Sequence, residues 1–103
     1  MKNFSFNNQV LERSFQIPVI VEFSADGCGP CLWVEKQMVE IHRDNSERFD
    51  FVSIPISMFP KAIELYTLQS NPTLIIFKNG EPIARLRGAL PKMAVLQWVN
   101  DHI

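Results

Sequence analysis

The chain has 103 residues, of which 47% are hydrophobic and 20% charged, and its formal net charge at pH 7 is −1. This charge gives no electrostatic basis for binding nucleic acid or an anionic membrane surface, and no apolar run approaches the ~20 residues that cross a membrane as a helix. A chain of this length can bury a core of its own, so we expect residues 1–103 to form a single domain.

The first part of the chain predicts strands that alternate with helices. Residues 4–6 alternate between aromatic and polar and predict a short edge strand, and Asn7 or Asn8 can cap a short helix after it. Val19–Ser24 is apolar at nearly every position, which predicts a central strand covered on both faces. Apolar residues at i, i+4 and i+7 then predict a helix over residues 30–45.

The middle of the chain predicts a second strand and a short helix. Residues 49–56 are rich in β-branched and aromatic residues and predict a strand. We expect its regular pairing to end near Ile54, because Pro55 has no N–H to donate to a neighbouring strand. A short helix is expected over residues 60–68, with three candidate core residues: Ile63, Leu65 and Leu68.

Two strands and a helix complete the expected fold. Residues 73–77 and 82–86 predict strands joined by a hairpin turn with Asn79 and Gly80 at its centre, and Pro91 can begin the last helix. The predicted order of elements is β-α-β-α-β-α-β-β-α. It indicates an α/β fold with a central mixed sheet of about four to five strands, flanked by helices on both faces.

The only two cysteines form the motif Cys28-Gly29-Pro30-Cys31, between a predicted strand and a predicted helix. Residues i and i+3 share one face of a helix, so the two sulfurs can bond if the helix begins near Cys28. The free N–H groups and the positive dipole of a helix start favour a thiolate there. Pro30 suits a first helical turn, and Gly29 lets another chain approach the sulfur. The motif predicts a dithiol that exchanges disulfides, in which Cys28 attacks and the shielded Cys31 resolves the mixed disulfide.

A structural zinc half-site is the alternative interpretation of this motif. Zinc takes four ligands, but the sequence has no further cysteine, and His42 and His102 are not spaced as a ligand pair. We therefore predict no metal and no bound cofactor, while a metal shared between two chains stays open as an alternative. The first eight residues lack the apolar core of a signal peptide, and together with the C-x-x-C pair this predicts a cytoplasmic protein.

Glu22 is the one charged residue within the apolar strand Val19–Ser24. One interpretation places its carboxylate in solvent at the end of the strand, since acids are seldom fully buried without a partner. The other places a partly buried carboxylate beneath the cysteines, where burial raises its pKa and it passes protons to and from Cys31. On the second interpretation Glu22 joins Cys28 and Cys31 as a candidate catalytic residue.

Over nearly its whole length the chain resembles the thioredoxin family. Five segments carry the resemblance by their order and spacing: Val21-Glu22-Phe23, Cys28-Gly29-Pro30-Cys31, Asn71-Pro72-Thr73, Phe77-Lys78-Asn79-Gly80 and Gly88-Ala89-Leu90. The resemblance implies the thioredoxin fold and a chain that reduces disulfides in protein substrates. It also implies an electron donor of the thioredoxin-reductase type that restores the dithiol, and we expect a monomer.

The resemblance further implies a substrate-binding surface around the cysteines. Pro72 would follow a cis peptide bond and face the disulfide, and the backbone of Asn71 would pair with a substrate strand. Gly88 and Ala89 would line the groove in which that strand lies. The predicted substrate-binding residues are Gly27, Gly29, Pro30, Asn71, Pro72, Gly88 and Ala89.

Several positions differ from the family pattern. Gly27 stands where the family usually has tryptophan, Asn71 replaces a β-branched residue, and Leu32 replaces a basic one. The lysine that usually pairs with the buried acid falls near Ser53, so we expect Glu22 to lack that partner. These differences motivate an alternative function, in which the chain is a binding or assembly module on the thioredoxin fold with little redox activity.

Overall fold

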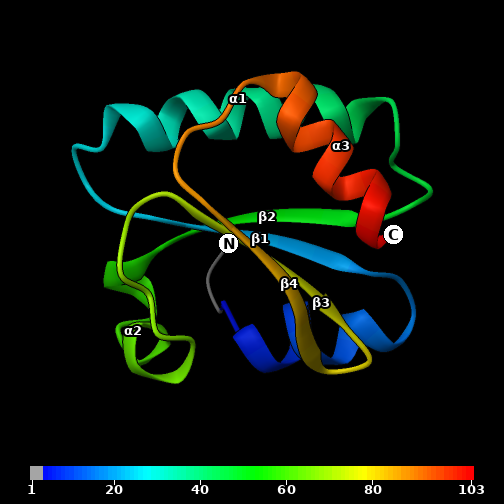
Figure 1. The fold of residues 1–103 in the computed structure, drawn as a ribbon. Helices are drawn as coiled ribbons and strands as arrows, with labels where there is room; N and C mark the ends of the chain where they lie inside the picture. The colour runs from blue at the N-terminus through cyan, green and yellow to red at the C-terminus, as the bar shows by residue number, and fades with distance from the viewer. Residues whose placement is uncertain (1–3) are drawn as a thin grey trace.

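A four-stranded mixed sheet forms the centre of the structure, a computed structural model that describes residues 4–103 (Figure 1). The strands are β1 (Val19–Ser24), β2 (Asp50–Pro55), β3 (Thr73–Lys78) and β4 (Glu81–Arg87). They lie in the order β2-β1-β3-β4, with β1 parallel to β2 and with β3 antiparallel to both β1 and β4. The predicted α/β class with a mixed sheet is confirmed. Residues 1–3, part of the stretch from which we predict that a signal peptide is absent, lie outside the described residues.

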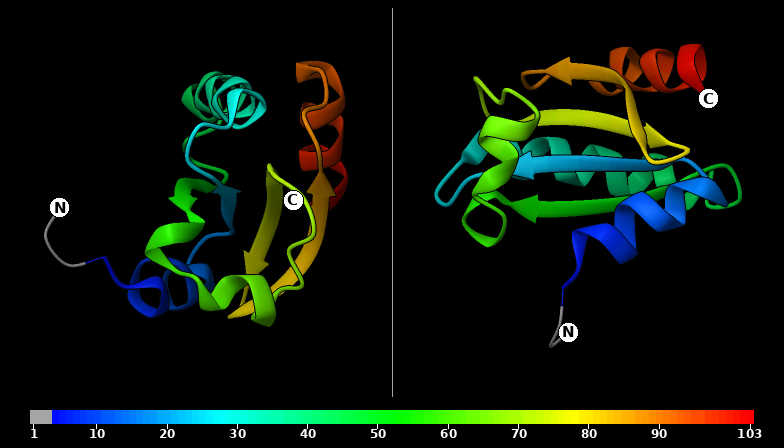
Figure 2. Two further views of the ribbon diagram at one scale, coloured as in Figure 1. Left: turned by 90° about the vertical axis from the view of Figure 1, so that its left-hand side faces the viewer. Right: turned by 90° about the horizontal axis from the view of Figure 1, so that it is seen from below.

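Helices cover both faces of this sheet, as predicted. Figure 1 shows one face covered by two helices, α1 (Gly29–Arg43) and α3 (Lys92–His102). Figure 2 shows the other face from below, where the shorter helical segments lie in front of the strands: η1 (Asn7–Glu12), η2 (Arg13–Phe15), η3 (Ile56–Met58) and α2 (Lys61–Leu65). No helix among residues 4–103 combines the length and the apolar character that crossing a membrane requires.

Each face of the sheet buries its own apolar cluster, because side chains alternate between the two faces along a strand. The cluster beneath α1 and α3 consists of Ile20, Val34, Met38, Ile41, Phe49, Leu74, Ile76, Val95, Trp98 and Val99. The cluster on the opposite face consists of Phe6, Val10, Val19, Val21, Phe23, Ile54, Ala62, Ile75 and Phe77. Strand β1 supplies side chains to both clusters and is fully buried from residue 19 to residue 23, which confirms its predicted central place.

The predicted strand at residues 4–6 is wrong, because this segment begins a helical turn. The Ser5 hydroxyl accepts a hydrogen bond from the N–H of Asn8 at 3.2 Å, and the Ser5 carbonyl accepts one from the N–H of Gln9 at 2.8 Å. A serine that satisfies free N–H groups in this way is typical of a helix start. Phe6 is buried, with its ring against the rings of Phe23 and Phe77. Packing and capping therefore outweigh the alternation of three residues.

The predicted helix over residues 60–68 is shorter than expected, and two of its three predicted core residues are wrong. In α2 only Ala62 is buried, whereas Ile63 is 45% and Leu65 is 61% exposed. Leu68 follows the helix. Together with the ring of Tyr66, it packs against the cluster on the face opposite α1 and α3. A helix of five residues turns little more than once, so it presents one small side to the sheet and leaves the others in solvent.

The strand ends agree with prediction to within one residue. Pro55 still pairs with Ser24 and extends β2 one position beyond the predicted end, which an edge strand tolerates because it has a side without a partner strand. The hairpin turns at Asn79 and Gly80, as predicted. Their φ angles of 54° and 82° are the left-handed values that a two-residue hairpin turn of this kind requires.

Candidate active site

A disulfide between Cys28 and Cys31 lies at the first turn of α1, with the two Cα atoms 5.2 Å apart. Cys28 is the N-cap residue, with extended backbone angles, and its Sγ accepts a hydrogen bond from the backbone N–H of Cys31 at 3.1 Å. Pro30 lies within the first turn of the helix, where its missing N–H removes no hydrogen bond. The predicted helix start at the motif is therefore confirmed.

The two sulfur-bearing residues differ in exposure. Cys28 is half-buried, whereas Cys31 is 3% exposed and lies one turn further into α1. A disulfide partner in solution can therefore reach the sulfur of Cys28 first. The helix start supplies that sulfur with an N–H donor and the positive end of the helix dipole.

The sheet register brings the predicted binding segments to the end of the sheet that carries the motif. Phe23 pairs with Thr73, which in turn pairs with Arg87, so the loop after β1, the start of β3 and the end of β4 lie side by side. The peptide bond between Asn71 and Pro72 is cis, as predicted. Across the same edge, the N–H of Gly88 donates to the carbonyl of Pro72 at 2.9 Å.

The predicted substrate-binding residues differ in their exposure at this end of the molecule. Pro72 is buried and Gly88 is half-buried. The others are exposed: Gly27, Gly29, Pro30, Asn71 and Ala89. Gly27 and Gly88 have φ angles of +71° and +91°, which favour glycine, so both loops take turns that a side chain would strain. The binding role of these residues stays a prediction.

Glu22 is fully buried beneath α1, which rules out the interpretation that placed its carboxylate in solvent. It points to the same face of the sheet as Ile20, toward α1, because the two are separated by two positions on β1. The hydroxyl of Ser53 donates to its Oε1 at 3.4 Å, and its Oε2 has no hydrogen-bond partner among the described residues. Burial, and then the negative charge of Glu35, raise the pKa of Glu22 to about 8. Ser53 lies opposite Glu22 on β2, so the lysine partner is absent there, as expected.

A small hollow of about 210 Å³ lies beside the two cysteines. Its lining comes from the end of β1, the loop after it and the first two turns of α1: Ser24, Ala25, Asp26, Gly27, Cys28, Cys31, Leu32 and Glu35. Glu35 is not among the site residues predicted from the sequence. Its position four residues after Cys31 was the available signal, because residues i and i+4 share one side of a helix.

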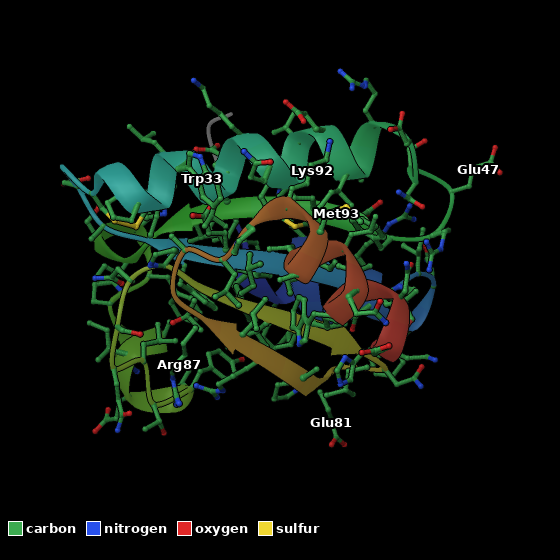
Figure 3. All side chains as sticks on the ribbon, turned by 45° about the horizontal axis from the view of Figure 1, so that its top comes forward. Trp33, Glu47, Glu81, Arg87, Lys92 and Met93 are labelled. Carbon is green, nitrogen blue, oxygen red and sulfur yellow. A yellow bond between two sulfur atoms is a disulfide. The ribbon has the colours of Figure 1, made fainter. Side chains whose placement is uncertain are left out.

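A second, wider groove of about 730 Å³ runs along the outer side of α1, starting at Gly29. Its apolar lining comes from Leu32, Trp33 and Val39, which are 64%, 41% and 53% exposed. Figure 3 shows Trp33 on this helix, away from the loop that precedes the motif. Among residues 4–103, no three side chains of histidine, cysteine, aspartate or glutamate come together as metal ligands.

Comparison with known proteins identifies the family. The thioredoxin family model matches residues 1–101. The thioredoxin of Rickettsia typhi is 36% identical over 101 residues, which are 98% of this chain and 94% of the relative. Thioredoxin 1 of Synechococcus elongatus is 35% identical over 99 residues, 96% of this chain and 91% of the relative. Chloroplastic thioredoxin Y of Oryza sativa is 34% identical over 102 residues, 99% of this chain and 60% of the relative.

These matches extend over almost the whole chain and include the segment that carries the disulfide. They favour redox chemistry over the alternative of a binding module. Because its family model, its relatives and its Cys28–Cys31 disulfide agree, this chain belongs to the thioredoxin family and is a thiol–disulfide oxidoreductase.

Proposed function

We propose that this protein reduces disulfides in other proteins, with Cys28 as the attacking sulfur and Cys31 as the resolving one. The observation that carries the proposal is the half-buried Sγ of Cys28 at the N-cap of α1, where it accepts the N–H of Cys31. A negative charge on this sulfur is stabilised by that N–H and by the helix dipole. Cys31 is shielded and cannot compete for the first contact.

In the first step, the Cys28 thiolate attacks one sulfur of a substrate disulfide. A new bond forms between Cys28 and that sulfur, the substrate S–S bond breaks, and the other substrate sulfur leaves as a thiolate that takes a proton from solvent. The thiolate is the attacking species, so the stabilisation at the helix start acts directly on this step.

In the second step, Cys31 resolves the mixed disulfide. Its thiol gives its proton to the carboxylate of Glu22 and attacks the Sγ of Cys28, and the second substrate sulfur leaves as a thiolate. The protein is left with the Cys28–Cys31 disulfide, and the substrate has gained two electrons. A donor of the thioredoxin-reductase type then returns two electrons and restores the dithiol. Glu22 suits the role of base because its raised pKa, about 8, lies close to neutrality.

We further propose that an extended segment of the substrate lies across the end of the sheet next to the motif. Asn71 is exposed ahead of the buried Pro72, so its backbone is available to pair with an extended segment. The remaining contacts come from Gly27, Gly29, Pro30, Gly88 and Ala89. We place the protein in the cytoplasm as a monomer that passes electrons to the disulfides of its substrates.

Reduction of insulin by dithiothreitol tests the proposal. The wild-type protein accelerates precipitation of the insulin chains, and Cys28→Ser abolishes the acceleration. Cys31→Ser instead accumulates a mixed disulfide with the substrate, because attack proceeds and resolution does not. Activity that persists in Cys28→Ser rejects the assignment of the attacking sulfur. Equilibration with glutathione measures the reduction potential, and a value as oxidising as that of a disulfide donor rejects the reducing direction.

A further inference from the structure

We propose that Glu35 is the residue through which the buried Glu22 exchanges its proton with solvent during resolution by Cys31. The inference rests on the proposed function, in which Glu22 accepts the proton of Cys31. It assigns to Glu35 a role that acts through Glu22 and involves no contact with the reacting sulfurs.

Glu22 is isolated from solvent and from most hydrogen-bond partners. Its side chain has no exposed surface, and Ser53 is the only hydrogen-bond partner recorded for its carboxylate among the described residues. Ser53 is half-buried and donates to Oε1, which leaves Oε2 free to take a proton. A proton that arrives from Cys31 must leave again before the next turnover, because a protonated Glu22 cannot act as a base. The buried carboxylate therefore needs a neighbouring group that reaches solvent.

Glu35 is placed to serve this need. It stands one turn after Cys31 on the same side of α1, and both line the hollow of about 210 Å³ beside the cysteines. A water molecule occupies about 30 Å³ in the liquid, so the hollow has room for several. Glu35 is half-exposed, whereas Glu22 is fully buried. Glu22 points from β1 toward α1, the helix that carries Glu35.

The charges around Glu22 favour the same path. Glu35 interacts with it electrostatically from α1, and Ser53 donates to it from β2. Cys31 and Asp26 line the hollow together with Glu35. The negative charge of Glu35 is one cause of the raised pKa of Glu22, so the two carboxyl groups interact electrostatically. A negative charge nearby opposes the ionisation of Glu22, so Glu22 holds its proton more tightly while Glu35 is charged.

The proposed transfer balances within the resolving step. The Cys31 thiol loses its proton to Glu22 as the Cys28–Cys31 bond forms and the substrate thiolate leaves. The proton then moves from Glu22 to the Glu35 carboxylate, and from Glu35 through water in the hollow to bulk solvent. The departing substrate thiolate takes one proton from solvent in exchange for the one that Cys31 releases, so the resolving step has no net proton change.

The experiment separates the two steps with the aromatic disulfide dithionitrobenzoate. Attack by Cys28 on this reagent releases one coloured thiolate, and resolution by Cys31 releases a second, so stopped-flow absorbance yields one rate for each step. The rates are measured between about pH 6 and pH 9, a range that includes the raised pKa of Glu22. The variants are Glu35→Gln, Glu35→Asp and Glu22→Gln, and the double variant combines the two glutamine changes. Glu47→Gln is the charge-matched control, because Glu47 is exposed in the loop beyond the other end of α1 (Figure 3).

Glu35→Gln is expected to lower the limiting rate of the second release roughly fivefold to tenfold, less than the full effect of a general base because water partly replaces the lost group. The first release keeps its rate. The pH midpoint of the second release moves to lower pH, because the charge that raises the pKa of Glu22 is gone. Glu35→Asp keeps most of the rate, and Glu47→Gln changes neither step. In the Glu22→Gln background, adding Glu35→Gln has no further effect.

Four results overturn the inference. The first is a shifted midpoint with an unchanged limiting rate, which means that Glu35 acts by charge alone. The second is that Glu35→Gln slows the second release equally in the wild-type protein and in the Glu22→Gln variant. In the third, Glu22→Gln leaves the second release unchanged, which also removes Glu22 from the proposed function. Slowing by Glu22→Gln but not by Glu35→Gln rejects the role of Glu35 and leaves the proposed function intact.

Discussion

Replacing Glu22 with glutamine should stabilise the oxidised protein, by an amount that grows with pH. Glu22 is fully buried, and its pKa rises from an ordinary value of 4.5 to about 8 in the folded protein. Below about pH 4.5 the carboxyl group is protonated in both the folded and the unfolded chain, so it adds no pH dependence. As the pH rises toward about 8, the unfolded chain gives up this proton while the folded chain retains it, and the free energy of unfolding falls.

The size of the effect follows from the difference between the two pKa values. Each pH unit within this window costs about 1.4 kcal/mol, so the loss is about 3 kcal/mol at pH 7 and about 5 kcal/mol well above pH 8. Glutamine has the shape of the protonated acid and does not titrate. Its oxygen can still accept the hydrogen bond from Ser53. The Glu22→Gln variant therefore keeps the stability that the wild-type protein loses.

Unfolding by guanidinium, followed by tryptophan fluorescence between about pH 4 and pH 9, measures the difference between wild type and variant. We expect a difference near zero at the acid end and an increase through neutrality. Glu47→Gln serves as the control, since Glu47 is exposed and its substitution should leave the pH dependence unchanged. A difference between Glu22→Gln and wild type that stays constant across this range refutes the reasoning. It would show that the carboxyl group has an ordinary pKa in the folded protein.

Three further substitutions test the packing of a buried ring, a buried hydrogen bond and an exposed ion pair. Phe77→Ala should lower the free energy of unfolding by about 3–5 kcal/mol in denaturant titration, because a fully buried ring is lost from the cluster below the sheet. Ser14→Ala should cost about 1–3 kcal/mol in the same measurement, because the buried hydroxyl accepts the N–H of Gly80 at 2.8 Å and joins the N-terminal segment to the hairpin. Lys92→Ala should leave the thermal midpoint nearly unchanged, although Lys92 contacts Glu40 at 2.8 Å, because both side chains are more than 40% exposed and solvent screens the pair.

The parts of the fold that sequence predicts well have strong local signals. Val19–Ser24 is apolar throughout, and only a central strand with both faces covered buries every such side chain. Asn79 and Gly80 tolerate the positive φ angles that the hairpin turn requires, so the turn follows from their chemistry. Alternation over residues 4–6 predicts a strand from only three positions, and a serine that caps the following turn outweighs so short a pattern.

The candidate site divides in the same way. The Cys28–Cys31 motif is visible in the sequence because its spacing and its helix start have direct chemical meaning. The burial of Glu22 is not, since a carboxylate in a strand can point to a helix or to solvent until the packing of α1 is known. The place of Glu35 is also only partly visible in the sequence. Its spacing from Cys31 predicts which side of the helix it lies on. That this side borders a hollow depends on the position of the loop that carries Asp26, which only the structure shows.

The two cysteines differ in what the fold supplies to them, and this difference explains why only one of them needs a proton acceptor. Cys28 lies at the helix start, where an N–H from Cys31 and the helix dipole stabilise a thiolate without any base. Cys31 is 3% exposed, and burial opposes the charge that it needs in order to attack. A proton acceptor beneath α1 lets Cys31 become reactive only while its proton leaves. On this argument Glu22, and Glu35 beyond it, affect resolution and leave the first attack unchanged, so the order of the two steps is built into one turn of helix.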